Sequence, residues 1–378
     1  MKYYIIAGEA SGDLHGSNLM KGLKQVDPQA EFRFWGGDLM AAQGGTMVKH
    51  YKETAIMGFW EVLKNLSKVT KNLRLCKEDI LKYKPDVVIL IDYPGFNFRI
   101  AEFTHKQGIK TFYYIAPKVW AWKKSRVKRL QKDIDKLFII FPFEIEYFKK
   151  WNIDAIYRGN PLIDSIADKT VNSPSFSEFI EKNKLPDKPI IAFLAGSRKQ
   201  EIKHIVPRVK KLVVEFPGYQ LILAAAPSLD KDFYAQYILP EDNMAAVYDQ
   251  TYDTLKVADV AIVASGTATL ETALLNTPQV VCYAGSEISY QIAKFLVKGY
   301  ISLVNIIMNA PVVKELIQHD MSLDKMKAEI ETLLFNESYR NAQLKAYQQL
   351  QESLGEYGSS KRVAEAMVKE LKKDCRTS

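Results

Sequence analysis

The sequence predicts an α/β protein built from two doubly wound domains, and three observations lead to this prediction. The chain has 378 residues, enough for about two domains that each bury their own core. Short apolar runs recur along it, as in strands that are covered on both faces of a parallel sheet. Segments with helical spacing of apolar residues separate these runs, so strands and helices are expected to alternate.

The expected strands fall into two groups. They are residues 3–7, 86–92, 110–116 and 136–141 in the first half, and 189–196, 219–226, 258–266 and 279–285 in the second. The segment 164–189 between the groups has three prolines and many polar residues, so we place the domain junction there. Residues 322–378 are rich in Glu, Lys, Gln and Ala and are expected to be helical, with a break at 356–360.

The composition is that of a soluble protein, with 47% hydrophobic and 25% charged residues. A net charge of +8 indicates an anionic partner, such as nucleic acid, an acidic lipid surface or a phosphorylated substrate. The three cysteines, Cys76, Cys282 and Cys375, are far apart and lack the spacing of a zinc site, so a reduced, cytoplasmic chain is expected. No signal-peptide pattern and no apolar run of membrane-spanning length is visible, so any membrane contact is expected to be peripheral.

A glycine-rich turn, AGEASGDLHG, follows the first expected strand and would lie at the ligand-binding edge of the sheet. Its glycine spacing matches neither a dinucleotide-binding turn nor a P-loop, and Glu9 inside it would repel a diphosphate. Sugar hydroxyls suit this carboxylate better. The alternative is structural: Gly8 and Gly12 permit a tight turn with positive φ, and Ser11 or Asp13 caps the following helix.

The turn after the first strand of the second half is a better candidate for binding an anion. Gly196, Ser197 and Arg198 precede a helix there. Backbone amides, a hydroxyl and a guanidinium at a helix start can bind phosphate. The alternative is an ordinary turn with a solvent-exposed arginine.

A second turn of this kind occurs in the segment ASGTATLE, where Ser265, Gly266 and Thr267 follow another expected strand. If their amides hold a diphosphate, the carboxylate of Glu271, about one helical turn further along, can accept hydrogen bonds from ribose hydroxyls. The alternative is that Thr267 caps the helix and Glu271 faces water.

Several segments together carry a resemblance that runs nearly from end to end. They are AGEASGD (7–13), MGFWEVL (57–63), KPDVVILIDYPGFN (84–97), GIKTFYYIAPKVWAWKKSRV (108–127), FPFE (141–144), AGSR (195–198), ASGTATLE (264–271), QIAKFLVKGYISLVN (291–305) and VVKEL (312–316). With these segments the chain resembles the lipid A disaccharide synthases, inverting glycosyltransferases with two facing Rossmann-like domains of the glycosyltransferase B type. It departs from many relatives at Gly95, where a second Asp is common, and at Asn160, where His is common, so we expect no base at either position.

The resemblance implies transfer of 2,3-diacylglucosamine from its UDP derivative to 2,3-diacylglucosamine 1-phosphate, with release of UDP, in a Gram-negative bacterium. It implies that residues 1–165, joined by a returning C-terminal helix at 340–378, form the acceptor and membrane side, and that residues 166–339 bind the UDP-sugar. The protein would be cytoplasmic and peripheral to the inner membrane, with its C-terminal helices as a candidate homodimer interface. No cofactor and no metal are expected, although DID at 133–135 and DKD at 230–232 formally fit an Asp-x-Asp pattern.

The resemblance also suggests the catalytic residues. Asp92, at the end of an expected strand, is the candidate base that takes the proton of the acceptor hydroxyl, unless it merely caps the turn before Pro94. Arg198 would neutralise the leaving diphosphate, and Glu9 is the third catalytic candidate. The expected substrate-binding residues are Gly8, Ser11, Gly12, Asn97, Gly196, Ser197, Ser265, Gly266, Thr267, Glu271 and Asn305.

Two stretches combine basic and aromatic residues, at 59–75 and 118–136. Lysines near an anionic bilayer and tryptophans at the headgroup level favour reversible docking. The candidate membrane contacts are Phe59, Trp60, Leu63, Leu66, Trp120, Trp122, Lys123, Lys124 and Arg126. The alternative for 59–75 is an amphipathic helix that packs on the core, and no nucleic-acid-binding module is recognisable.

Two other classes of function stay open on the sequence alone. One is another two-domain UDP-sugar enzyme, an N-acetylglucosaminyltransferase or a UDP-sugar 2-epimerase, the latter being active on the UDP-sugar by itself. The other is a non-catalytic peripheral lipid-binding protein, in which substitutions at Asp92 and Arg198 would leave the measurable function unchanged.

Overall fold

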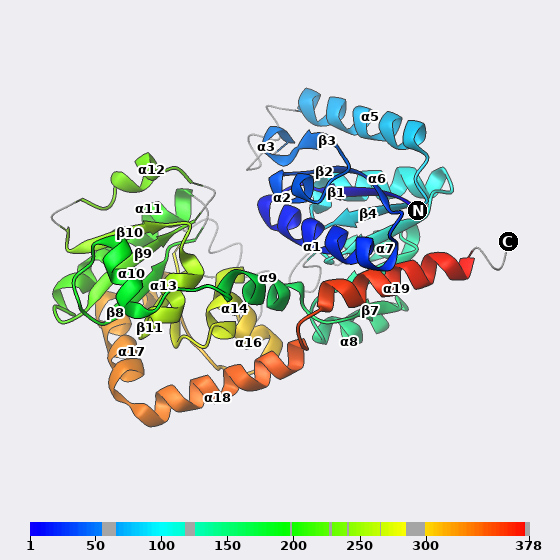
Figure 1. The fold of residues 1–378 in the computed structure, drawn as a ribbon. Coiled ribbons are helices and arrows are strands. Elements are labelled where there is room, and N and C mark those ends of the chain that lie inside the picture. The colour runs from blue at the N-terminus through cyan, green and yellow to red at the C-terminus, as the bar shows by residue number, and fades with distance from the viewer. Residues whose placement is uncertain are drawn as a thin grey trace. The chain divides into compact units, whose positions relative to one another are not determined.

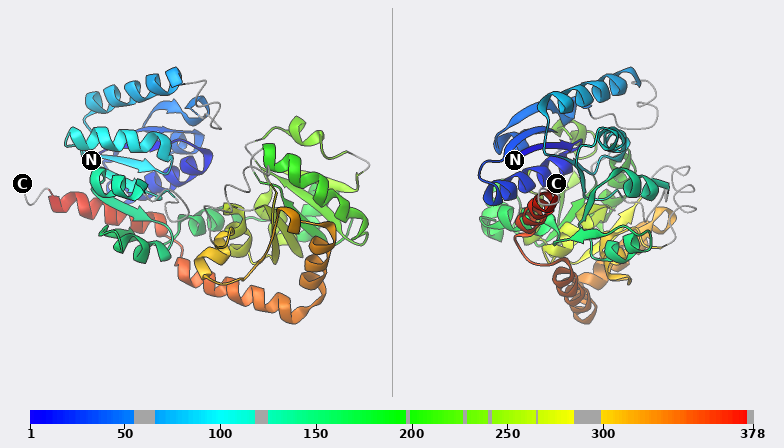
Figure 2. Two further views of the ribbon diagram at one scale, coloured as in Figure 1. Left: turned by 180° about the vertical axis from the view of Figure 1, so that it is seen from behind. Right: turned by 90° about the vertical axis from the view of Figure 1, so that its right-hand side faces the viewer.

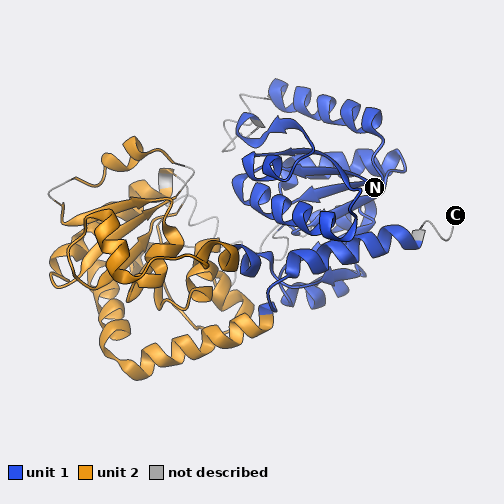
Figure 3. Cartoon of the chain, in the orientation of Figure 1, with its two compact units in different colours: residues 1–165, 354–378 blue, residues 166–353 orange. Residues whose placement is uncertain are grey.

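The computed structural model divides the chain into two compact units (Figure 3). Unit 1 is residues 1–165 with 354–378, and unit 2 is residues 166–353. The structure describes residues 1–54, 66–117, 125–196, 199–226, 229–239, 242–264, 266–284 and 299–374. Each unit is a parallel sheet with helices on both faces, which confirms the prediction of an α/β protein with two Rossmann-like domains.

Unit 1 is built on a seven-stranded sheet in the order β3-β2-β1-β4-β5-β6-β7. Its strands are β1 (Lys2–Ala7), β2 (Glu31–Gly36), β3 (Thr46–His50), β4 (Val87–Ile91), β5 (Thr111–Tyr114), β6 (Lys136–Ile139) and β7 (Ala155–Tyr157). Its helices are α1 (Ala10–Val26), α2 (Asp38–Ala42), α3 (Tyr51–Thr54), α5 (Leu66–Tyr83), α6 (Pro94–Lys106), α7 (Ser125–Asp133), α8 (Phe143–Lys149) and α19 (Ser359–Asp374). The strand order reverses between β1 and β4, which creates a topological switch point there.

Two apolar cores cover the two faces of this sheet. On one face, α1, α2 and α19 bury residues such as Leu19, Met40 and Met367, and α19 lies along α1 (Figures 1 and 2). On the other face, α5, α6 and α7 bury residues such as Ile80 and Phe98. Because both faces are covered, the central strands β1 and β4 are almost wholly apolar.

Unit 2 repeats this plan with a six-stranded sheet in the order β10-β9-β8-β11-β12-β13. Its strands are β8 (Ile190–Leu194), β9 (Gln220–Ala225), β10 (Met244–Tyr248), β11 (Val260–Ala264), β12 (Gln279–Tyr283) and β13 (Lys314–Ile317). Its helices are α10 (Phe176–Asn183), α11 (Lys199–Val209), η1 (Lys210–Val214), α12 (Lys231–Ala235), α13 (Thr251–Val257), α14 (Thr267–Leu274), α16 (Leu303–Met308), η3 (Gln318–Asp320) and α17 (Leu323–Phe335). The strand order of unit 2 reverses between β8 and β11.

Two helices cross the boundary between the units in sequence, α9 (Pro161–Thr170) and α18 (Glu337–Leu354). In unit 1, Asp164 of α9 accepts hydrogen bonds from the backbone of Gly358, Ser359 and Ser360, so its carboxylate caps the start of α19. The two crossing segments are therefore tied together on unit 1.

The C-terminal return begins later than the expected residue 340. Residues 340–353 belong to unit 2, where α18 is held by side-chain hydrogen bonds to β12. Gln343 accepts a hydrogen bond from the backbone N–H of Gln279, and the Gln279 side chain donates to the Tyr347 hydroxyl. Only the residues from 354 onward join unit 1.

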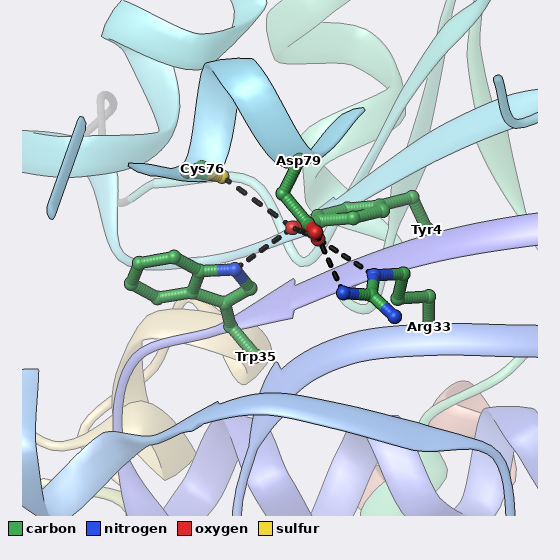
Figure 4. Close-up of polar contacts among 5 residues, drawn as sticks. All are labelled: Tyr4, Arg33, Trp35, Cys76 and Asp79. Carbon is green, nitrogen blue, oxygen red and sulfur yellow. Dashed lines mark hydrogen bonds and ion pairs between the residues drawn. The ribbon is translucent and has the colours of Figure 1, made fainter. Parts of the chain in front are cut away.

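A buried polar network fixes α5 on the sheet of unit 1 (Figure 4). The guanidinium of Arg33 on β2 donates two hydrogen bonds, of 2.7 and 2.6 Å, to the carboxylate of Asp79 on α5. The Tyr4 hydroxyl on β1 donates to the same carboxylate at 2.8 Å and accepts from the Trp35 indole at 2.9 Å. Cys76 completes the group, with Sγ 4.0 Å from the Tyr4 oxygen. Burial, followed by the charges of Cys76 and Asp79, raises the pKa of Tyr4 far above its ordinary value, so its hydroxyl stays a donor.

Replacing Asp79 with alanine should therefore lower the free energy of unfolding of unit 1 by about 2–4 kcal/mol, because the change leaves Arg33 and Tyr4 without their acceptor. Urea unfolding, together with hydrogen exchange of the β1 and β2 amides, measures the loss. Glu78→Ala is the matched control, since Glu78 is exposed on the same helix and pairs with the exposed Arg74 across one turn. Equal behaviour of the two variants would contradict a structural role for the network.

Candidate functional site

Candidate residues that the structure describes lie beside the switch point of each sheet. In unit 1, Glu9 follows β1 and Asp92 follows β4, the two strands that flank the reversal. In unit 2, Gly196 follows β8 and Gly266 follows β11, again the flanking pair. Open α/β sheets bind ligands at the carboxyl ends of strands at such a point. The topology thus gives each unit one candidate ligand-binding edge.

Asp92 lies in a strained turn at the end of β4. Asp92 and Tyr93 have φ angles of 42° and 48°, a left-handed conformation that non-glycine residues adopt rarely. The turn is held by its own neighbours, because the backbone carbonyl of Asp92 accepts hydrogen bonds from the Asn97 side chain at 2.8 Å and from the Tyr113 hydroxyl at 2.5 Å. The surrounding structure therefore dictates the direction in which the Asp92 side chain leaves the strand.

Gly8 is required by close packing against this turn. A Cβ atom at Gly8 would lie 2.3 Å from the ring of Tyr93, and one at Gly16 would lie 2.5 Å from Met40 Sδ. Neither Gly8 nor Gly12 has a positive φ, so the structural alternative based on a left-handed turn is wrong. Glu9 is the N-cap of α1, but its side chain makes no capping hydrogen bond and is exposed.

The glycine-rich turn contains a buried carboxylate whose role the sequence did not reveal. Asp13 accepts hydrogen bonds from the backbone N–H groups of Gly37, Leu39 and Met40, so it caps α2 rather than α1 as the structural alternative supposed. Burial lowers the pKa of His15 to about 4, so this imidazole is neutral near pH 7. Residues 8–16 thus offer acidic and neutral side chains but no cation for a diphosphate.

The two glycine turns of unit 2 are open to a ligand. Gly196 has a φ of 89°, a left-handed conformation that favours glycine, while the Glu201 Oε2 that a Cβ there would meet at 2.6 Å is the end of a flexible side chain. Gly266 has a φ of 135° and is the N-cap of α14, with no side-chain capping hydrogen bond. The exposed Thr267 begins the helix, so the first amide N–H groups of α14 can donate hydrogen bonds to an anion. Ser197, Arg198 and Ser265 lie outside the described residues.

Glu271 turns toward a partner on the neighbouring helix. The hydroxyl of Tyr252 on α13 donates a hydrogen bond of 2.8 Å to Glu271 Oε1, so the carboxylate does not simply face water. Burial raises the pKa of the Glu271 carboxyl, while the hydrogen bond from Tyr252 and the charge of Lys169 act in the opposite direction.

A pocket of about 190 Å³ lies at the carboxyl edge of the unit 2 sheet, at the ends of β9 and β10.

Two predicted substrate contacts are occupied within the protein. The Asn97 amide is fully buried and donates to the carbonyls of Ile91 and Asp92, so it supports the Asp92 turn. The Asn305 amide donates to Val313 and Glu315 and accepts from the Val313 N–H. This arrangement favours a positioning role for both asparagines over direct contact with substrate.

Most of the candidate membrane contacts lie outside the described residues. They are Phe59, Trp60, Leu63, Trp120, Trp122, Lys123 and Lys124, and the side chain of Leu66 is not described either. Arg126 is half-buried on α7. In the part of 59–75 whose side chains the structure describes, Leu73 of α5 packs against the core while Lys68 and Lys71 are exposed, which is the core-packed alternative for this part of the stretch. None of the described helices combines the length and the apolar character that crossing a bilayer requires.

The two formal Asp-x-Asp pairs lie at the ends of helices and strands. Asp135 accepts a hydrogen bond from the Thr111 N–H, and Asp133 is buried at the end of α7. Asp230 is the N-cap of α12. Within the described parts of the chain, no group of three or more His, Cys, Asp or Glu side chains is arranged to hold a metal ion.

The fold and the site together define the class as a two-domain α/β protein with a candidate ligand-binding edge in each Rossmann-like unit. Comparison with known sequences specifies the family. The family model described as lipid-A-disaccharide synthetase matches residues 3–370. The chain belongs to this family, and it is a glycosyltransferase of lipid A biosynthesis.

Curated relatives of this chain are similar to it in sequence over most or nearly all of its length. The lipid-A-disaccharide synthase of Geobacter metallireducens is 35% identical over 375 residues, covering 98% of this chain and 97% of the relative. That of Syntrophus aciditrophicus is 35% identical over 379 residues, covering 98% of each. That of Coxiella burnetii strain Dugway is 34% identical over 344 residues, covering 89% of this chain and 90% of the relative.

Solved structures with low identity support the fold alone. A UDP-GlcNAc 2-epimerase from Neisseria meningitidis, bound to UDP-GlcNAc, has a TM-score of 0.64 at 14% identity and covers 98% of this chain and 100% of its own. A putative UDP-N-acetylglucosamine 2-epimerase from Listeria monocytogenes has a TM-score of 0.69, with 98% and 97% covered. A calicheamicin glycosyltransferase has a TM-score of 0.61 at 12% identity, with 98% of each covered.

Proposed function

We propose that this chain transfers 2,3-diacylglucosamine from UDP-2,3-diacylglucosamine to the 6-hydroxyl of 2,3-diacylglucosamine 1-phosphate. The products are UDP and the β-1,6-linked disaccharide 1-phosphate. The observation that carries the proposal is the family match over residues 3–370. The epimerase alternative rests on a likeness of fold at 14% identity, so it is not favoured over the full-length sequence match.

In the proposed reaction the acceptor hydroxyl attacks the anomeric carbon from the side opposite to UDP. Asp92 takes the proton of this hydroxyl, which suits a carboxylate at a strand end that is oriented by its own turn. Glu9, exposed at the neighbouring strand end, is proposed to hydrogen-bond sugar hydroxyls.

The leaving UDP is proposed to be held by unit 2. The amides at the start of α14 bind the diphosphate, Arg198 neutralises its developing charge, and Glu271 accepts hydrogen bonds from the ribose. The glycine turn of unit 1 offers no cation in residues 8–16 and is assigned to the sugars instead.

The direct test is incubation of the purified protein with UDP-2,3-diacylglucosamine and 2,3-diacylglucosamine 1-phosphate, followed by mass spectrometry. A disaccharide 1-phosphate with stoichiometric UDP is expected. Each substrate is also incubated alone: epimerisation of the UDP-sugar without acceptor, or no product with both, would overturn the proposal.

We also propose that the protein docks reversibly on the cytoplasmic surface of the inner membrane, where its acylated substrates lie. Support comes from the basic and aromatic sequence at 118–136 and from the net charge of +8. Homodimerisation through the C-terminal helices stays a prediction, which light scattering in solution can test.

Charge reversal at Lys123 and Lys124 should weaken binding to anionic vesicles at least about tenfold, because each basic residue near the surface contributes about 1 kcal/mol. Sedimentation with phosphatidylglycerol-containing vesicles at low salt measures the binding. Reversal of Lys182 and Lys211, two exposed lysines of unit 2, is the control with the same change of net charge. If the wild type itself fails to sediment, membrane docking is excluded.

A further inference from the structure

The contact between Tyr252 and Glu271 connects the two helices that follow β10 and β11. Tyr252 is the second residue of α13, and Glu271 lies on the second turn of α14. The 2.8 Å hydrogen bond from the Tyr252 hydroxyl goes to Oε1 of the carboxylate. Within the described parts of the chain, Oε2 receives no hydrogen bond, so one oxygen is fixed and the other is available.

Packing holds this pair in one orientation. Ala268 and Leu275, on the same face of α14 as Glu271, pack against the apolar cluster that also buries Leu255 of α13. On the other side, Lys169 of α9 places its ammonium 5.4 Å from the centre of the Tyr252 ring, a cation–π contact. Tyr252 is thus clamped between a cation and a carboxylate, and both contacts lie within unit 2.

The electrostatics keep the hydroxyl of Tyr252 protonated. Burial, together with the charge of Glu271 and the hydrogen bond to it, raises the pKa of Tyr252 well above its ordinary value. Burial raises the pKa of the Glu271 carboxyl, and the hydrogen bond from Tyr252 and the charge of Lys169 oppose this rise. With Oε1 already holding the Tyr252 hydroxyl, Oε2 is the oxygen that can accept a hydrogen bond from a ligand diol.

We propose that Tyr252 is a positioning residue for nucleotide recognition: its hydroxyl fixes the Glu271 carboxylate so that Oε2 faces the vicinal hydroxyls of the donor ribose. The inference rests on the proposed function, because it requires the UDP of the donor to bind at the end of β11. It adds a residue, Tyr252, that does not itself contact the substrate but orients Glu271 for its contact with the ribose.

The test measures UDP affinity by calorimetry for Tyr252→Phe, Glu271→Ala and the double variant. Tyr252→Phe removes a single hydroxyl and is expected to weaken UDP binding about 3- to 10-fold. The KM for the donor should rise by the same factor with kcat within about twofold, since the contact acts equally on the ground state and the transition state. Glu271→Ala should weaken binding more, and adding Tyr252→Phe to it should cost nothing further.

Two comparisons separate this role from general destabilisation. Tyr219→Phe is the control and should leave UDP affinity unchanged, because the partly buried Tyr219 directly precedes β9 at the amino end of that strand, away from the carboxyl edge of the sheet. With 2′-deoxy-UDP as the probe, the penalty of Tyr252→Phe should shrink, because one of the hydroxyls that Glu271 would accept from is missing.

The outcomes distinguish the inference from the proposal beneath it. If Glu271→Ala leaves UDP affinity unchanged, the proposed nucleotide site in unit 2 is wrong. If Glu271→Ala weakens binding while Tyr252→Phe alone does not, or if Tyr252→Phe costs as much in the Glu271→Ala background as in the wild type, the site stands and the positioning role of Tyr252 is refuted.

Discussion

Replacing Asp92 with asparagine should lower the turnover of disaccharide synthesis by about 10²- to 10⁴-fold, the usual contribution of a general base. Asparagine keeps the size and the hydrogen-bonding oxygen of the side chain but cannot take a proton near neutral pH. The loss should appear in kcat, measured with both lipid substrates at saturation, because proton removal belongs to the transition state rather than to substrate binding.

The structure indicates that Asp92→Asn preserves the conformation of the turn. Asp92 has a φ of 42°, and asparagine is among the few residues that tolerate this left-handed conformation. The contacts that hold the turn, from Asn97 and Tyr113, reach the backbone carbonyl and not the carboxylate, so they survive the change. Folding should therefore stay intact, as circular dichroism and the thermal midpoint can verify.

Asp86→Asn is the matched control for this experiment. Asp86 precedes the same strand at its opposite end, where its carboxylate accepts a hydrogen bond from the Lys2 N–H, a bond that an asparagine oxygen can also accept. Activity close to wild type is expected for Asp86→Asn. The same result for Asp92→Asn would remove Asp92 from the role of base and leave it as a turn residue.

The central strands could be predicted from the sequence because burial on both faces makes them continuously apolar. The runs at 3–7 and 86–92 correspond to β1 and β4, which are buried almost throughout. The strands that the prediction missed, β2, β3, β7, β10 and β13, include every edge strand. β3 is exposed or half-buried and its sequence TMVKH mixes polar with apolar residues, whereas β7 has only three half-buried residues, too short a run to identify a strand.

Site residues could be predicted from the sequence where they directly follow a buried strand. Their hydrogen-bond partners could not be predicted where these come from a distant part of the chain. Asp92 and Gly266 could be placed at sheet edges from their position in the chain. The capping role of Asp13 depends on the backbone of residues 37–40, and the contact of Glu271 depends on Tyr252, and neither spacing is periodic. Pairings of this kind are made by tertiary packing, which a local pattern does not encode.

Replacing Arg198 with alanine should lower kcat by about 10²- to 10³-fold, the effect of removing one donor to charge that develops in a transition state. Arg198 follows the glycine at the end of β8 and directly precedes α11, so in the chain it stands at the switch point of unit 2. A leaving diphosphate gains charge as the glycosidic bond breaks, and a guanidinium meets two of its oxygens with two parallel hydrogen bonds.

The decisive variant is Arg198→Lys, which keeps the charge and removes the planar pair of donors. It should recover no more than about a tenth of the lost activity if the paired hydrogen bonds matter, whereas a purely electrostatic role would restore most of it. Arg208→Lys, at an exposed position on α11, is the control and should behave as wild type. Wild-type kinetics for both Arg198 variants would show that this side chain only faces solvent, and the leaving group would then depend on the amides at the start of α14 alone.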